Sequence, residues 1–287
     1  MFGIKRLLRK SLRKLIKWSE EPPQPPSDIG PCDATEIRYT STPLFVSIMN
    51  EQQWHQYVWP SVQAAKLAKR LGYERVSFIE FGVAGGNSLV KLEAIARRLE
   101  DYFKINIDVY GFDTGTGLTR PQDYRDMPNL WSEGYFPMDV EKLQHRLTKA
   151  QLMLGPVGET VPSFLKKSPA PVAFAAFDMD LYSSTMEAFT LFDAEESLFL
   201  PRVHCYFDDI LAYSICEFNG ELLAITDFNA AHPLRKVAAI RGIRYFVPAR
   251  FANIRWENYY MLHIFDHSLY ACNDGIVEAE MPLTDAV

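Results

Sequence analysis

The chain of 287 residues has a hydrophobic content of 48% and a charged content of 23%, values that are ordinary for a globular protein able to bury a large core. Its net charge of −6 argues against a nucleic-acid-binding protein that depends on overall positive charge. The four cysteines are scattered without a C-x-x-C pair, which predicts neither a zinc site nor a disulfide framework and favours a reducing, cytoplasmic setting.

The first 19 residues differ in composition from the rest of the chain. The stretch MFGIKRLLRKSLRKLIKW contains seven lysines and arginines and no acidic residue, with leucine and isoleucine at helical spacing. We predict a basic amphipathic helix over 1–19, followed by a proline-rich linker over 20–32 and one domain over 33–287. Peripheral contact of residues 1–18 with the inner membrane surface, docking on a partner and a solvated tail remain open.

Helical and strand patterns alternate along the domain. A helix over 50–72 is expected to be interrupted at Pro60, and two closing strands, over 243–249 and 259–266, are expected to pair antiparallel at the sheet edge. We predict a Rossmann-like α/β fold, a seven-stranded mostly parallel sheet with helices on both faces and an antiparallel closing strand. The other expected strands are 76–84, 107–113, 152–157, 172–178 and 203–209, and the other helices are 88–103, 184–196 and 220–232.

A glycine-rich turn follows the first strand, in the sequence FIEFGVAGGNS. Glycines let the backbone turn sharply and approach a ligand closely, and the next helix offers free N–H groups at its start. The pattern E-x-G-x-x-G-G differs from the dinucleotide pattern G-x-G-x-x-G. It fits S-adenosylmethionine, which lacks the pyrophosphate, although a strand-to-helix turn without a ligand remains the alternative.

The second strand ends in YGFD, which places Asp113 about thirty residues beyond the glycine turn. An acid at this carboxyl edge can accept the ribose hydroxyls of an adenosine, as in dinucleotide sites. A capping role for Asp113 is the alternative.

Four aspartates follow two very apolar strands. Asp178 and Asp180 come after PVAFAAF, and Asp208 and Asp209 end the run VHCYFDD. Carboxyl ends of neighbouring parallel strands meet at one edge, so these acids are expected to converge in the crevice where ligands bind. A cluster of carboxylates selects a hard cation such as Mg²⁺, whereas helix and turn capping is the alternative.

A long aromatic insert over 116–139 lies between the second strand and the next helix. Long loops at a carboxyl edge often form lids or binding walls. We therefore expect Trp131, Tyr135 and Phe136 either to stack on a sugar or aromatic ring, or to attach the loop to the body of the protein.

The motifs EFGVAGGNS, VYGFDTGTGL, FDMDLYSST and YFDD occur in this order within about residues 75–235. Together they resemble the class I S-adenosylmethionine-dependent methyltransferases, in particular the macrocin O-methyltransferase family. The turn TGTGL departs from the aromatic-acid-glycine turn that is usual in that family. The resemblance implies cofactor contacts from Glu80, Gly82, Val83, Ala84, Gly85, Ser88, Asp113 and Asp178.

The same resemblance implies a Mg²⁺ site with one ligand from the D-x-D segment together with Asp208 and Asp209. Of the two candidates in that segment we favour Asp180 over Asp178, because it lies 28 residues before Asp208 and just beyond the strand end. Asp180 and Asp208 are accordingly the expected catalytic residues.

The function implied is an S-adenosylmethionine-dependent, Mg²⁺-assisted O-methyltransferase acting on a hydroxyl of a sugar or other small glycosylated or polyol substrate. It would work in the cytoplasm without nucleic acid, and assembly into a homo-oligomer is left open. Two alternatives remain. One is an NAD(P)-dependent nucleotide-sugar or alcohol oxidoreductase, which the sequence supports poorly because it lacks G-x-G-x-x-G and because Tyr182 is followed by Met186 where a Y-x-x-x-K pair needs lysine. The other is a non-catalytic protein tethered to a membrane by its basic helix.

Overall fold

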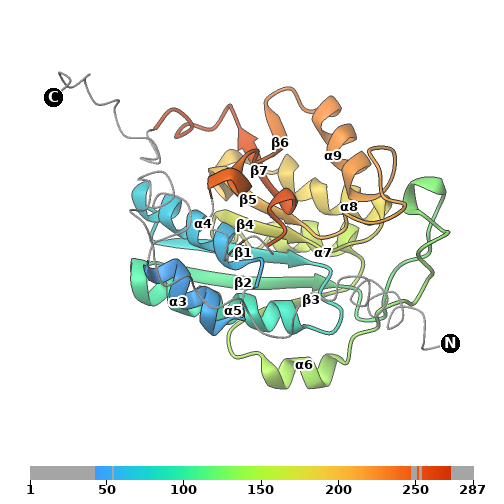
Figure 1. Cartoon of the computed structure of the whole chain (residues 1–287), viewed down its shortest axis with the longest axis horizontal. Coiled ribbons are helices and arrows are strands. Elements are labelled where there is room, and N and C mark those ends of the chain that lie inside the picture. The colour runs from blue at the N-terminus through green and yellow to red at the C-terminus, as the bar shows by residue number, and fades with distance from the viewer. Residues whose placement is uncertain (1–42, 54, 247–250, 252–253, 273–287) are drawn as a thin grey trace.

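A computed structural model describes residues 43–53, 55–246, 251 and 254–272 (Figure 1). The expected amphipathic helix over 1–19 and the linker over 20–32 lie outside the described residues. Among the helices in the described part of the chain, none is both long enough and apolar enough to cross a membrane.

Seven strands form one sheet in the order β3-β2-β1-β4-β5-β7-β6. The strands β1 to β5 are parallel to one another, whereas β7 is antiparallel to both β5 and β6. This confirms the expected mostly parallel sheet with an antiparallel closing strand. The strands are β1 (Arg75–Phe81), β2 (Asn106–Asp113), β3 (Gln151–Leu154), β4 (Val172–Phe177), β5 (Phe199–Phe207), β6 (Arg235–Ala239) and β7 (Tyr259–Ile264).

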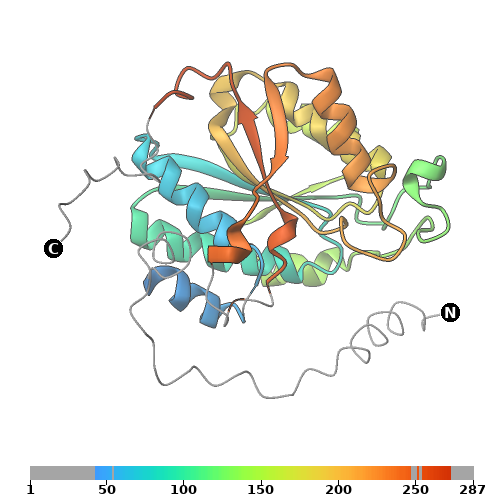
Figure 2. The same cartoon turned by 45° about the horizontal axis from the view of Figure 1, so that its top comes forward.

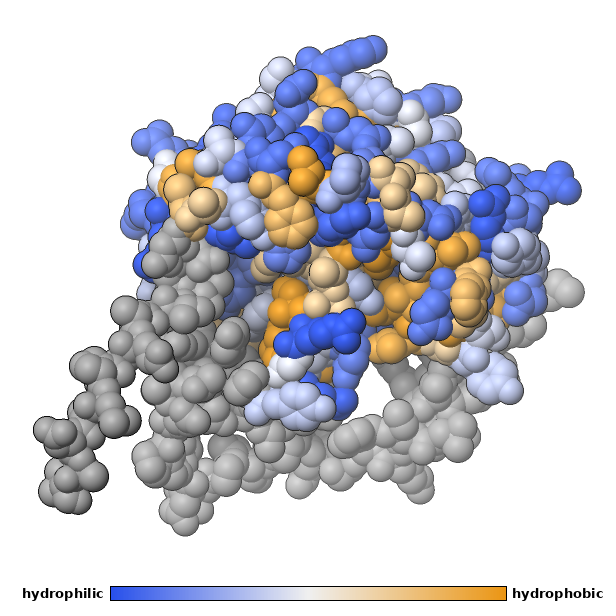
Figure 3. Space-filling view, turned by 90° about the horizontal axis from the view of Figure 1, so that it is seen from above, coloured by the Kyte–Doolittle hydropathy of each residue, from blue (hydrophilic) through white to orange (hydrophobic). Residues whose placement is uncertain are grey.

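Helices cover both faces of the sheet (Figures 1 and 2). One face packs against α3, α4 and α5 in a first apolar cluster, and the other packs against α7, α8 and α9 in a second. The helices are α3 (Pro43–Glu51), α4 (Val58–Arg70), α5 (Asn87–Phe103), α6 (Val140–Arg146), α7 (Val157–Leu165), α8 (Tyr182–Phe189) and α9 (Gly220–Ala231). On the face seen from above, apolar side chains lie in small groups among hydrophilic ones (Figure 3).

Three stacked phenylalanines support the carboxyl edge of the sheet. Phe81, Phe177 and Phe207 are the last residues of β1, β4 and β5, and all three are fully buried. The ring of Phe177 lies 5.2 Å from that of Phe81 and 4.7 Å from that of Phe207, with interplanar angles of 17° and 7°. Because these strands are in register, the residues that follow them begin at the same level.

Two expectations about secondary structure are wrong. Pro60 does not interrupt a helix, because it lies in the first turn of α4, where a backbone N–H has no partner within the helix. The expected strand over 243–249 is absent from its described part, where Ile243–Phe246 forms a 3₁₀ helix after a turn at Gly242, with φ of 83°. The edge strand is instead β6, whose five-residue sequence RKVAA has a single buried residue, Val237, and is too short to show a clear strand pattern.

The stacked phenylalanines generate a prediction about stability. Phe177→Ala should lower the free energy of unfolding by about 3–5 kcal/mol, because it removes a fully buried ring that contacts both neighbouring strands. Urea unfolding measures the change, and Phe218→Ala, at a side chain that is 73% exposed, is the control. Equal losses in the two variants would contradict the supporting role of the stack.

Candidate functional site

The glycine turn brings the end of β1 directly against the end of β4. Gly82 has φ of 83°, and a Cβ atom at this position would overlap the carbonyl group of Asp178. Ala84 and Gly86 also have positive φ values, of 46° and 74°. Glycine at position 82 is therefore required both by its backbone conformation and by this close approach. The turn and the first acid of FDMDLYSST form one contiguous site.

Asp113 holds the glycine turn in place. Its Oδ2 accepts hydrogen bonds from the backbone N–H groups of Val83 (2.9 Å) and Ala84 (2.8 Å). Its Oδ1 accepts one from Gly115 (2.7 Å), in the turn that follows β2. The carboxylate thus joins the loops after β1 and β2, two of the elements expected to hold a cofactor. Its expected contact with ribose hydroxyls stays a prediction, since each carboxylate oxygen can accept more than one hydrogen bond.

Glu80 is a fully buried acid just before the turn. The Tyr57 hydroxyl donates a hydrogen bond to its Oε1 at 3.0 Å. Burial raises the pKa of Glu80 to about 8, against the lowering effect of hydrogen bonds from Ser88 and Tyr57. Near neutral pH this carboxyl is therefore protonated in the free protein, and a nearby positive charge would favour its ionised form.

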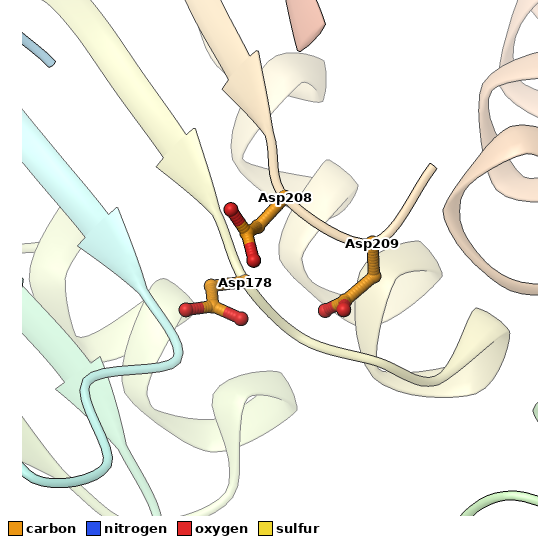
Figure 4. Close-up of side chains that lie close together, drawn as sticks. All are labelled: Asp178, Asp208 and Asp209. Carbon is orange, nitrogen blue, oxygen red and sulfur yellow. The ribbon is translucent and has the colours of Figure 1, made fainter. Parts of the chain in front are cut away.

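The structure brings Asp178, Asp208 and Asp209 together, as Figure 4 shows. Each residue offers a carboxylate oxygen, and these three oxygens lie within 4.8 Å of one another. Backbone hydrogen bonds between the strands continue past their last residues. The backbone N–H of Asp178 donates to the carbonyl of Phe81 at 2.9 Å, and that of Asp208 donates to the carbonyl of Phe177 at 2.9 Å. Burial raises the pKa of Asp178 well above its ordinary value, and the charges of Asp209 and Asp208 raise it further.

Asp180 is not one of these three residues, and Asp178 is the member of the D-x-D segment whose carboxylate lies beside those of Asp208 and Asp209. The chain turns at Asp180, which has φ of 62°, and its backbone N–H donates to Asp209 Oδ2 at 3.0 Å. A turn in this left-handed conformation gives the two aspartates different environments, and the sequence spacing did not reveal it. Whether a metal binds stays a prediction.

Three further residues hold Asp208, and none was expected from the sequence. The Tyr206 hydroxyl donates to Asp208 Oδ1 at 2.6 Å, and Arg255 Nη1 lies 3.2 Å from the same oxygen. Asn258 is fully buried, and its Nδ2 donates to the backbone carbonyls of Phe207 and Asp208. Arg255 and Asn258 lie about fifty residues further along the chain, so sequence proximity gave no signal for them.

Glu221 is a fully buried acid on α9, and it too was not expected from the sequence. Its Oε1 accepts from Met179 N at 3.2 Å, and its Oε2 accepts from Asp209 N at 3.1 Å. Burial raises the pKa of Glu221 well above its ordinary value, and the charge of Asp209 adds to this effect. The only signal in the sequence was an acid in the apolar run NGELLAI.

The insert over 116–139 is anchored beside the site. Asp126 is almost fully buried and accepts hydrogen bonds from the backbone N–H and the hydroxyl of Ser183, at 2.8 and 2.9 Å. The rings of Trp131 and Tyr135 lie 6.2 and 6.0 Å from that of Phe136. These aromatics contact one another within the insert, so both attachment to the body of the protein and stacking on a substrate stay predictions.

No protein-family model matches the chain, and no curated protein matches it. Among solved structures, the calicheamicin methyltransferase CalS11 is similar at 18% sequence identity and a TM-score of 0.49, covering 83% of this chain and 99% of that chain. The O-methyltransferase NovP is similar at 14% identity and a TM-score of 0.48, covering 71% and 77%. An apo structure of CalS11, described as a TDP-rhamnose 3′-O-methyltransferase, has 21% identity, a TM-score of 0.40 and coverage of 75% and 79%. At such identities and with TM-scores below 0.5, these similarities say nothing about the activity of this protein.

Glu80 generates a prediction about pH dependence. Its pKa is about 8 in the folded chain against an ordinary value of 4.5, so the unfolded chain loses this proton first as pH rises. The free energy of unfolding should therefore fall between about pH 4.5 and pH 8, by a few kcal/mol from this group alone. Glu80→Gln removes the proton equilibrium while keeping an oxygen that can accept from Tyr57.

Urea unfolding of the wild type and of Glu80→Gln at several pH values measures this contribution. The variant should gain stability relative to the wild type as pH rises towards 8. Parallel stability curves for the two proteins would show that the Glu80 carboxyl is not protonated in the folded chain.

Proposed function

We propose that this protein is an S-adenosylmethionine-dependent O-methyltransferase that methylates a hydroxyl of a sugar or other small glycosylated or polyol substrate with the assistance of Mg²⁺. The observation that carries the proposal is the direct contact between the glycine turn after β1 and the acid cluster after β4 and β5. A methyl donor held at the turn would lie beside a hydroxyl held at the cluster.

The side chains around the turn suit a positively charged donor. Glu80 and Asp113 flank the turn, and Asp178 meets it through its backbone. S-adenosylmethionine carries an ammonium group and a sulfonium centre, and either charge would stabilise ionised carboxylates in a buried site. The first backbone N–H groups of α5 have no acceptor within the helix, so they could donate hydrogen bonds to other parts of the ligand.

The acid cluster fits a hard divalent cation. Asp178, Asp208 and Asp209 supply only oxygen donors, and their mutual repulsion needs a positive charge to offset it. When bound, Mg²⁺ would supply Lewis-acid polarisation, lowering the pKa of a substrate hydroxyl and orienting its oxygen. Tyr206 and Arg255 would hold the Asp208 carboxylate in place from the side.

The reaction itself is a single displacement. The substrate oxygen forms a bond to the methyl carbon while the carbon–sulfur bond breaks, sulfur keeps the electron pair, and the hydroxyl proton is released. The chain contributes by placing donor and acceptor in one geometry, which lowers the entropic part of the barrier.

Cofactor choice is tested by binding. Calorimetry of the full chain should show binding of S-adenosylmethionine and no binding of NAD or NADP. Asp113→Asn should weaken the affinity for S-adenosylmethionine about tenfold or more, because an amide cannot accept from all three backbone N–H groups. Asp101→Asn, at an exposed position on α5, is the control. Binding of NAD in place of S-adenosylmethionine would support the oxidoreductase alternative, and binding of neither would favour a non-catalytic protein.

Metal dependence and ligand choice are tested by methyl transfer. Activity with a panel of nucleotide sugars, glycosides and polyols should fall at least about 100-fold in EDTA and return with added Mg²⁺. Asp178→Asn and Asp208→Asn should each lose most of this activity, whereas Asp180→Asn should lose less, because Asp180 lies outside the cluster. Full activity in EDTA and in Asp208→Asn would refute the metal role, and a larger loss in Asp180→Asn than in Asp178→Asn would reverse the choice of ligand.

A further inference from the structure

Glu221 links the two loops that carry the acid cluster. It lies in the first turn of α9 and is fully buried. One carboxylate oxygen accepts from Met179 N, in the loop after β4, and the other accepts from Asp209 N, in the loop after β5. Met179 directly follows Asp178, so both bonds reach the backbone at or next to a cluster aspartate.

Each of these two bonds uses a separate oxygen of the Glu221 carboxyl group. Each bond satisfies a backbone N–H that would otherwise lack a partner at the carboxyl edge of the sheet. A glutamine has a single acceptor, so one of the two N–H groups would face its NH₂ group. Because the two oxygens of the Glu221 carboxyl group are a fixed distance apart, these bonds fix the distance between the backbone of Met179 and that of Asp209.

The start of α9 is built so that Glu221 reaches this place. Gly220 has φ of 53°, and a Cβ atom there would lie 2.9 Å from Met127 Cε in the insert. Asn219, the residue before the helix, accepts from Cys216 N at 2.9 Å and donates to Ser214 O at 3.0 Å. The preceding loop is thus held by its own hydrogen bonds, and a glycine allows the helix to begin close against the insert.

We propose that Glu221 is a positioning residue for the cation site, which sets the distance between Asp178 and the Asp208–Asp209 pair through the backbone of their loops. The inference rests on the proposed function, since it concerns the same site. Substitution of a residue that orients metal ligands without binding the metal itself typically lowers metal affinity 10- to 100-fold. Glu221 would be such a residue, acting on the ligands through hydrogen bonds to main-chain N–H groups.

The test measures Mn²⁺ affinity of the full chain by electron paramagnetic resonance, with Mn²⁺ standing in for Mg²⁺. Glu221→Gln should bind Mn²⁺ about tenfold or more weakly than the wild type, with an altered spectrum of the bound ion. Its affinity for S-adenosylmethionine should fall less than its affinity for Mn²⁺, because the two hydrogen bonds of Glu221 go to the loops after β4 and β5 and not to Asp113 or the glycine turn itself.

Asp227→Asn is the matched control. Asp227 lies on the same helix and accepts from the Tyr182 hydroxyl at 2.8 Å, so the substitution makes the same carboxyl-to-amide replacement away from the two loops. It should leave Mn²⁺ affinity unchanged. If Glu221→Gln does not fold, Glu221→Met provides the same measurement, because an apolar side chain of similar size avoids burying an unpaired amide.

Three outcomes would overturn the inference. If Glu221→Gln binds Mn²⁺ as tightly as the wild type does, the positioning role fails while the proposed function stands. An equal loss in Asp227→Asn would make the effect a general one of the helix. If the wild type binds no Mn²⁺, the cation part of the proposed function fails and this inference fails with it.

Discussion

Repulsion between acids crowded at one edge of a parallel sheet is the constraint on which this structure depends. Five carboxyl groups lie near the ends of the central strands. Two belong to buried residues, one on β1 and one on α9, and three belong to the loops after β4 and β5. Burying such groups is costly unless hydrogen bonds or positive charges offset the cost. The five residues are Glu80, Asp178, Asp208, Asp209 and Glu221.

Hydrogen bonds and one ion pair from the surrounding residues partly offset the cost of burying these carboxyl groups. Backbone N–H groups donate to Glu221, and tyrosine hydroxyls donate to Glu80 and Asp208. Arg255 adds one positive charge beside Asp208, but its side chain is 55% exposed, so solvent weakens the pair. The pKa of Asp178 remains raised by burial and by its acidic neighbours. The protein therefore holds an arrangement that a bound cation and a cationic donor would stabilise, which is the physical basis of the proposed function.

The apolar core of the sheet supports this arrangement. The stacked rings of Phe81, Phe177 and Phe207 align the ends of three strands, and helices cover the sheet on both sides. Asp126 anchors the insert to the start of α8 through Ser183, so the insert is tied to the same framework. Side chains that are far apart in the sequence thereby hold the loops at the carboxyl edge of the sheet in place.

The sequence by itself determined the fold class, the glycine turn and the four aspartates, because each leaves a local signal: alternating apolar runs, glycines between a strand and a helix, and acids directly after buried strands. It placed the edge strand wrongly, since the five residues of β6 are too few to show such a pattern. Only the tertiary structure decided that Asp178, and not Asp180, joins Asp208 and Asp209, because the turn at Asp180 separates two residues that look equivalent in the sequence. It alone also brought in Glu221, Arg255 and Asn258, whose contacts depend on how distant segments meet and not on any spacing along the chain.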